Sequence, residues 1–323
     1  MWNRGARRFK FVDRALHLAA TAPLLQFFLD RKDRDLFLHF ELVPDRLDEK
    51  MLDTLARFPD GAIQLEAGVQ SFNPEVLELI SRKQNAEKVA TTFRRLRAET
   101  GVHLHSDLIV GLPAETLDSF GRGFDKLMAL EPQEIQVGIL KRLNGAPIRR
   151  HDNTWKMIYN SAPPYELMEN ALLDFKTMQR MKRFSRYFDL LYNSGNFRKS
   201  VELIWEGSSP FAGFLEFTDW LFQQTGRTSA IALNRLAEYL FDYLSQIRQL
   251  EPAACANQIY GDFKRAGRKS IPGKIQEYVT VPTRRPQKPT RSALPPRQLR
   301  HSRKDRSKSY ESVGIGYFSG QEA

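Results

Sequence analysis

The sequence contains a single cysteine, Cys255, among 323 residues. One thiol excludes an intramolecular disulfide, and it cannot build the zinc or iron–sulfur sites that need several thiolates. No uninterrupted apolar run reaches the roughly 18 residues of a membrane-spanning helix. The basic start, Met1 to Arg8, is not followed by an apolar segment with a small-residue cleavage site. We therefore expect no secretory signal and a cytoplasmic protein.

Acidic residues are scarce only near the C-terminus. The net charge is +11, but 15 Lys/Arg and two acids lie between residues 264 and 308, a net +13, so the remainder carries −2. The globular part is therefore nearly neutral, unlike a basic nucleic-acid groove. After Val281 the chain is rich in proline and arginine and poor in apolar residues. We expect residues 280–323 to form a disordered basic tail that makes weak, non-specific contacts with polyanions.

Roughly the first 140 residues alternate short apolar runs with amphipathic stretches, a pattern typical of βα units around a parallel sheet. The runs predict five strands, at 8–13, 36–43, 62–69, 102–110 and 134–140. Helical spacing predicts helices between them, at 15–30, 48–57, 74–81, 86–99 and 116–129. We therefore predict an α/β fold, with a partial βα barrel of about five parallel strands over residues 1–150.

From about Pro163 onward only helical spacing remains. It predicts helices at 165–193, 198–206, 210–224, 229–250 and 253–266, and so an all-helical C-terminal domain over residues 163–267. Aromatic residues are dense here, and basic residues are not interleaved among them. We interpret these aromatics as a core and not as a surface that stacks nucleic-acid bases.

Polar side chains share one face of each of three predicted strands. They are His39 and Glu41 on the second strand, Glu66 and Gly68 on the third, and His103, His105 and Asp107 on the fourth. Alternate side chains of barrel strands face the lumen, and active sites form at the carboxyl ends of the strands. These faces would therefore converge on one cavity. Carboxylates and imidazoles in such an interior are unusual for packing alone.

Two motifs at these strand ends carry a family resemblance. They are E-x-G-x-Q-S at Glu66–Ser71 and D-L-I-x-G-L-P at Asp107–Pro113. With their flanking sequences they resemble, in order and spacing, the later barrel strands of the radical S-adenosylmethionine (SAM) superfamily. The resemblance is to the elongator-like and oxygen-independent coproporphyrinogen oxidase-like branch, and in particular to cobalamin-binding members that end in an uncharacterised helical domain. FKFVDRALHL near the start and LPPRQLRH near the end also resemble that subgroup.

The resemblance implies that SAM binds across the carboxyl-terminal mouth of the barrel. By matching motif positions, Glu66, Gln70 and Ser71 would approach its ribose and amino-acid portion. The adenosine side would be lined by Asp107, Ile109 and Gly111. Gly68 and Gly111 fit this role because a residue without a Cβ lets the backbone approach a ligand closely.

The chain departs from the family in one respect. Family members carry a CxxxCxxC loop whose three thiolates hold a [4Fe–4S] cluster, and the subgroup also binds cobalamin. The sequence has neither that loop nor a cobalamin-binding domain. We interpret the chain as an N-terminally truncated member, from a mis-called start, a split gene or a decayed gene, which binds neither group and is inactive alone. A separate chain that carries the missing part is a candidate partner.

Two other functions remain open from the residues. His103, His105 and Asp107 lie at i, i+2 and i+4, which on a strand is a metal-ligand spacing. Together with Glu66 they would make the chain a metal-dependent barrel hydrolase. Alternatively, the chain is a non-enzymatic binding protein whose basic tail contacts polyanions. None of these patterns identifies the substrate.

A barrel without its first strand leaves the predicted strand at 8–13 as an open edge that carries Phe9, Phe11 and Val12. Unpaired strand backbone next to apolar side chains favours aggregation or pairing with another chain. We therefore expect poor solubility when these 323 residues are expressed alone. Size-exclusion chromatography checks this, and a high yield of stable monomer would contradict it.

Overall fold

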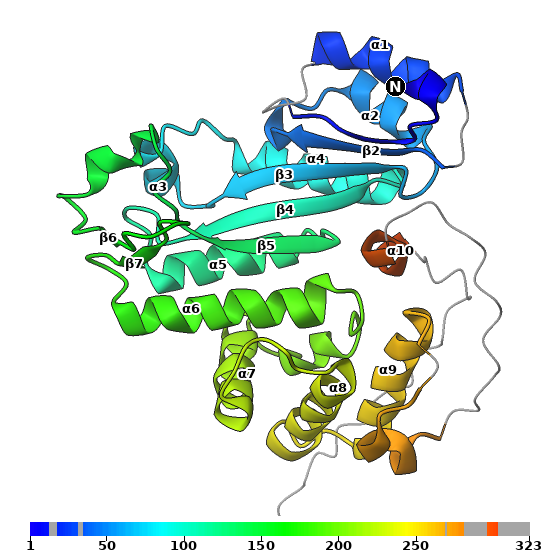
Figure 1. The fold of residues 1–323 in the computed structure, drawn as a ribbon, viewed down its shortest axis with the longest axis vertical. Helices are drawn as coiled ribbons and strands as arrows, with labels where there is room; N and C mark the ends of the chain where they lie inside the picture. The colour runs from blue at the N-terminus through cyan, green and yellow to red at the C-terminus, as the bar shows by residue number, and fades with distance from the viewer. Residues whose placement is uncertain (13–17, 32–34, 269, 281–295, 303–323) are drawn as a thin grey trace, which may run out of the picture.

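The computed structural model describes residues 1–12, 18–31, 35–268, 270–280 and 296–302. Five parallel strands form one open sheet in the order β1-β2-β3-β4-β5. They are β1 (Arg8–Lys10), β2 (Phe37–Leu42), β3 (Ile63–Gln70), β4 (His103–Val110) and β5 (Glu134–Ile139). The helices between them are α1 (Leu18–Leu29), α2 (Glu49–Ala56), α3 (Pro74–Leu79), α4 (Ala86–Glu99) and α5 (Leu117–Met128). The predicted partial barrel is confirmed (Figure 1).

The starts of these helices follow from local chemistry. The side chains of Asp48, Asn73, Asn85 and Thr116 each accept a hydrogen bond from a backbone N–H in the first turn of the helix that follows. Such caps satisfy amides that have no partner within the helix. The predicted helix 15–30 begins in residues outside the described part, and its described portion is α1.

Strand alternation separates an apolar face of the sheet from a polar one. Leu38, Leu65, Leu104 and Leu108 are buried in the core that the sheet shares with its helices. The residues between them along each strand lie on the opposite face. The sequence pattern therefore places every predicted polar strand residue on one side of the sheet.

The C-terminal region is mainly helical, as predicted. It contains α6 (Phe175–Phe188), α7 (Pro210–Thr225), α8 (Leu233–Asp242), α9 (Pro252–Arg265) and α10 (Pro296–Ser302). One π-helical turn, Asp189–Asn193, continues α6, and a second, Tyr243–Ile247, continues α8. Short 3-10 helices lie at Trp2–Arg4, Pro44–Arg46, Pro147–His151, Val201–Ile204 and Gly273–Tyr278.

Three details of the predicted C-terminal region are wrong. The segment 165–193 is not one helix, because Leu167–Glu169 forms β7, which pairs with β6 (Ile158–Tyr159) in a small antiparallel sheet. Only Val201–Ile204 of the predicted helix 198–206 is helical, and it is a 3-10 helix. The tail is not disordered throughout 280–323, since Pro296–Ser302 folds as α10 against the main sheet. Residues 281–295 and 303–323 lie outside the described part.

Aromatic side chains join the helical region to the barrel. The ring of Phe124 on α5 lies 5.2 Å from Phe184 and 5.1 Å from Phe188 on α6, centroid to centroid. Phe184 also contacts Phe211 and Phe214 on α7. These side chains are buried in one continuous core with the sheet, so their interpretation as core aromatics is confirmed.

The two edges of the sheet are covered differently. Along β5, the Asn193 amide bonds both the N–H and the C=O of Ile135, and the Ser185 hydroxyl donates to Val137 O at 2.5 Å. At β1 the predicted edge is present, but Phe11 stacks on Phe40 at 4.4 Å and only Val12 is fully open, at 85% exposed. No helix within the described ranges is long and apolar enough to cross a bilayer.

Candidate functional site

The polar residues form rows across the sheet. Parallel register aligns Glu41, Glu66, His105 and Glu134 on four neighbouring strands. The next row toward the carboxyl ends contains Gly68, Asp107 and Gln136. A cavity of about 730 Å³ borders this face and is lined by Gln64, His105, Glu134 and Gln136 among others. The register thus places the predicted polar residues on one face of the sheet, but of these residues only His105 lines this cavity.

Negative charge accumulates at the carboxyl half of this face. Glu66 is hydrogen-bonded to His39, with 3.0 Å between Oε2 and Nε2. Burial, together with the charges of Glu66 and Glu41, raises the pKa of Asp107 to about 7. Asp107 Oδ1 lies 3.5 Å from His105 Nε2, yet neither atom has a hydrogen-bond partner within the described part of the chain. Two buried polar atoms thus face each other without a hydrogen bond, which is unusual in a folded protein.

The end of β3 is shaped by Gly68 and Gln70. Gln70 has a positive φ of 69°, and the strand register shifts between these two residues. A Cβ on Gly68 would lie 2.7 Å from the Gln70 amide nitrogen, while the Arg82 guanidinium donates to the Gly68 carbonyl. A side chain at residue 68 would therefore have to displace the Gln70 amide, which folds back over this glycine. The strained backbone at Gln70 is of the kind that gathers at ligand sites.

The other predicted SAM contacts have structural partners. Ser71 is buried and its hydroxyl accepts from Asn73 N at 3.0 Å. Gly111 has a φ of 93°, and a Cβ there would meet Leu167 at 2.4 Å, so protein fills the space expected for a ligand. Ile109 is half-buried on the same face as Asp107. At Gly68 the missing Cβ leaves room for the Gln70 amide at the end of the strand. At Gly111 the close packing of Leu167 explains the glycine.

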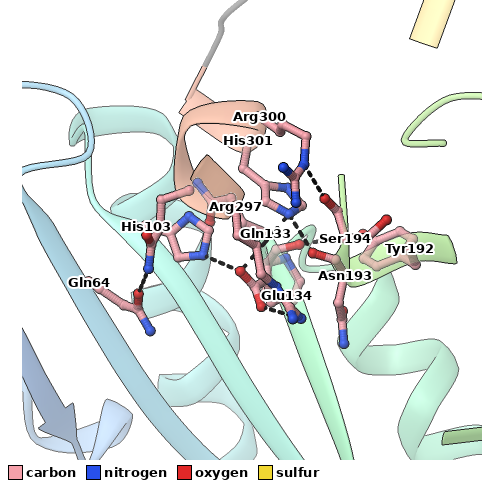
Figure 2. Close-up of polar contacts among 12 residues, drawn as sticks. Gln64, His103, Gln133, Glu134, Tyr192, Asn193, Ser194, Arg297, Arg300 and His301 are labelled. Atoms are coloured by element: carbon pink, nitrogen blue, oxygen red, sulfur yellow. Dashed lines mark hydrogen bonds and ion pairs between the residues drawn. The ribbon is translucent and has the colours of Figure 1, made fainter. Parts of the chain in front are cut away.

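At the amino-terminal end of the same face, α10 packs against the sheet (Figure 2). Arg297 pairs with Glu134 at 2.7 Å and with Asp189 at 2.6 Å. His301 bonds Asn193 O at 2.9 Å, and Gln298 donates to Gln64. Sequence reasoning missed these contacts, although proline at the first position of α10 is a helix-start signal.

Glu134 is a buried carboxyl that stays ionised. Burial raises its pKa, but the hydrogen bond from His103 and the positive charge of Arg297 outweigh burial and lower the pKa to about 2. The His103 Nε2 lies 3.0 Å from Glu134 Oε1 (Figure 2). Glu134 therefore carries a full charge across the physiological range.

The strand histidines each lie beside a different carboxylate and do not gather as a metal site would require. His103 is engaged by Glu134 at the α10 end, one row away from His105 and two rows from Asp107. Across the described ranges, no three histidine, cysteine or acidic side chains are grouped so that they could hold a metal ion. This arrangement does not support the hydrolase hypothesis.

Cys255 does not suit an iron–sulfur cluster. It lies on α9, is 1% exposed, and burial raises the pKa of its thiol to about 11. A cluster needs several ionised thiolates, and this is the one cysteine of the sequence. The residues present therefore do not fit a [4Fe–4S] group.

Comparison with known families divides the chain in two. Residues 8–127 match the radical SAM superfamily, and residues 153–294 match a family described as protein of unknown function DUF4080. The first range covers β1 to β4 of the open sheet, β5 lies between the two ranges, and the second range covers β6, β7 and α6 to α9. This agrees with the predicted order of a radical SAM barrel followed by a distinct C-terminal region.

Curated relatives match the barrel part. The oxygen-independent coproporphyrinogen III oxidase of Paracoccus denitrificans is 30% identical over 97 residues, which are 30% of this chain and 21% of the oxidase. The tRNA-2-methylthio-N(6)-dimethylallyladenosine synthase of Thermotoga petrophila is 25% identical over 160 residues, 49% of this chain and 34% of the synthase. The chain thus spans about a third or less of the length of these relatives.

Two solved structures are similar over part of the chain. The radical SAM methyltransferase TsrM of Kitasatospora setae, with tryptophan and a SAM analogue bound, gives a TM-score of 0.41 at 19% identity, covering 53% of this chain and 35% of TsrM. The Escherichia coli coproporphyrinogen III oxidase HemN gives 0.36 at 27% identity, covering 42% and 31%. With its E-x-G-x-Q-S and D-L-I-x-G-L-P strands, the part of the chain over residues 8–127 belongs to the radical SAM superfamily.

Proposed function

We propose that this chain is the SAM-binding part of a radical SAM protein and that it does not cleave SAM by itself. The ligand would lie on the carboxyl half of the polar face, over Glu41, Glu66, Gly68, Gln70 and Asp107. The cluster thiolates would come from polypeptide outside these 323 residues, either a separate chain or another part of a longer one. Neither the iron–sulfur cluster nor cobalamin is assigned to residues 1–323.

The negative charge around Asp107, which Arg82 offsets only in part, supports this proposal. Three carboxylates, Glu41, Glu66 and Asp107, interact closely enough for the first two to raise the pKa of the third, together with burial. SAM carries a positive sulfonium and a positive amino group, so it would offset this repulsion when bound. The buried Asp107 Oδ1 and His105 Nε2, which have no hydrogen-bond partner in the described part, would also gain polar contacts.

Each residue would have a separate task. Glu66, held in place by His39, and Asp107 would face the cationic groups of the ligand. Gly68 would leave room for the Gln70 amide at the strand end. Arg82, by donating to the Gly68 carbonyl, would fix the end of β3. When bound to a reduced cluster, SAM supplies radical chemistry, and these residues would bind and orient it.

We expect E66Q and D107N each to weaken SAM binding by roughly tenfold or more, because each removes a charge that faces the cationic ligand. Isothermal titration calorimetry at pH 8 measures this directly. Glu87→Gln is the matched control, since Glu87 is an exposed carboxylate on α4 and should leave the affinity unchanged. Equal affinities in all four proteins would contradict the proposed site.

A further inference from the structure

A second cavity lies at the opposite end of the strands from the proposed SAM site. It measures about 600 Å³ and is lined by residues from the ends of α4 and α5, the loops before β3 and β4, the π-helical turn after α6, and α10. This volume is within the range of small-molecule sites. None of the residues placed at the SAM site lines this cavity. The two sites can therefore be tested separately.

Arginine side chains converge on this cavity. Arg97 comes from α4, Arg198 from the loop after the π-helical turn, and Arg300 from α10. Burial and the nearby charge of Arg198 lower the pKa of Arg97. Arg97 Nε and Arg198 Nη1 are buried atoms with no hydrogen-bond partner within the described residues. Buried donors of this kind are costly unless something accepts from them.

The acids that line the cavity compensate these arginines only in part. Asp125 accepts from Ser209 Oγ at 2.6 Å and from Phe211 N at 2.7 Å, and so caps α7. Glu202 pairs with Lys199 at 3.1 Å. Glu131 and Asp60 also line the cavity, and the charge of Glu131 raises the pKa of Arg97 against burial and Arg198. No ion pair joins any of these four acids to Arg97 or Arg198 within the described part of the chain.

Aromatic and backbone contacts hold two of the cations in place. The guanidinium of Arg198 lies 4.3 Å from the ring centre of Tyr192, over its face. Arg300 Nε donates to Ser194 O at 2.5 Å (Figure 2). The arginines are thus positioned in advance, which reduces the entropy lost when an anion binds.

We propose that this cavity is a binding site for a phosphate-bearing small molecule, with the phosphate held between Arg97 and Arg198. The planar guanidinium group presents paired N–H donors that match phosphate oxygens, and two of them neutralise a dianion. The inference does not depend on SAM binding, because it involves residues at the other end of the sheet.

The test uses the full chain with inorganic pyrophosphate as the probe, at constant ionic strength. The wild-type protein should bind pyrophosphate, and R97M and R198M should each weaken binding by roughly ten- to a hundredfold. Arg94→Met is the matched control, since Arg94 is an exposed arginine on the same helix and should leave the affinity unchanged. Binding through the basic tail would not respond to R97M or R198M, so equal affinity in all four proteins overturns the proposal.

Thermal unfolding without an anion gives a second, independent readout. If Arg97 and Arg198 serve to bind a ligand, their partly buried charges repel each other and destabilise the ligand-free protein. R97M removes one of these charges and should therefore raise the melting temperature. Addition of pyrophosphate should then raise the melting temperature of the wild type and leave that of R97M unchanged. A fall in melting temperature for R97M, with no effect of pyrophosphate on the wild type, would mean that the arginines are structural and would overturn the proposal.

Discussion

Replacing Glu134 by glutamine is expected to lower the free energy of unfolding by about 3 kcal/mol at pH 7. The Glu134 side chain is 6% exposed, accepts from His103, and pairs with Arg297 at 2.7 Å. Glutamine keeps the shape but leaves Arg297 with only Asp189, whose side chain is 37% exposed, as its counter-charge. Because Arg297 belongs to α10, we also expect this helix to detach more readily in the variant (Figure 2).

The sign of the pH dependence follows from the lowered pKa. The pKa of Glu134 falls from 4.5 to about 2 in the folded chain, so its contribution is fully present above about pH 5. That contribution is lost as the pH falls toward 2. Urea unfolding at pH 7 and at about pH 3 should therefore show a smaller gap between wild type and E134Q at the lower pH. A gap that stays the same at both pH values, or a loss no greater than for exposed Glu87→Gln, would contradict the expected role of the charge.

Replacing Asp107 by asparagine should do the opposite and stabilise the chain by about 2–4 kcal/mol at pH 8. The Asp107 side chain is 18% exposed, and its pKa is raised from 3.8 to about 7 by burial and by Glu66 and Glu41. Above pH 7 the folded protein must carry a buried charge that the unfolded chain holds in water. Asparagine removes that cost.

For a carboxyl with a raised pKa, the stability contribution is present at low pH and is lost as the pH rises from about 4 to about 7. The advantage of D107N over the wild type should therefore grow between pH 5 and pH 8. Asp53→Asn, at an exposed position on α2, is the matched control and should show no such growth. The account is contradicted if D107N is less stable than the wild type at pH 8.

Glu134 and Asp107 show how one face of the sheet shifts the pKa values of two carboxyls in opposite directions. They lie in adjacent rows, yet their pKa values are about 2 and about 7. Glu134 pairs with Arg297 of α10 and accepts a hydrogen bond from His103, whereas the acids Glu66 and Glu41 near Asp107 outweigh Arg82. Groups whose surroundings push their pKa values apart mark functional sites. The contrast supports the proposal that the carboxyl end of this face binds the ligand, while the α10 end stabilises the fold.

Periodicity in the sequence was sufficient to predict the sheet but not the small elements. The alternation in 36–43 predicts β2, which spans Phe37–Leu42, because one face of that strand is buried and the other is polar. The strand Leu167–Glu169 is too short for alternation to be seen, and it was assigned to a helix. Short strands depend on their pairing partners, here Ile158–Tyr159, more than on local pattern.

The site was predicted only where local sequence decides geometry. Glu66, Gly68 and Asp107 lie on the predicted face because strand side chains alternate. The role of Gly111 was not visible, since the side chain that fills its space, Leu167, is 56 residues away in the sequence. The docking of α10 rests on Glu134 and on residues 189–194, so no local pattern reveals it.

The most direct test of the proposed SAM site compares SAM with S-adenosylhomocysteine, which lacks the sulfonium charge. Calorimetric titration of the 323-residue chain at pH 8 should show SAM binding roughly tenfold or more tightly, because the carboxylates around Asp107 favour the cation. The preference should disappear in D107N. Equal or tighter binding of S-adenosylhomocysteine by the unaltered chain would contradict the claim that this acidic face recognises SAM.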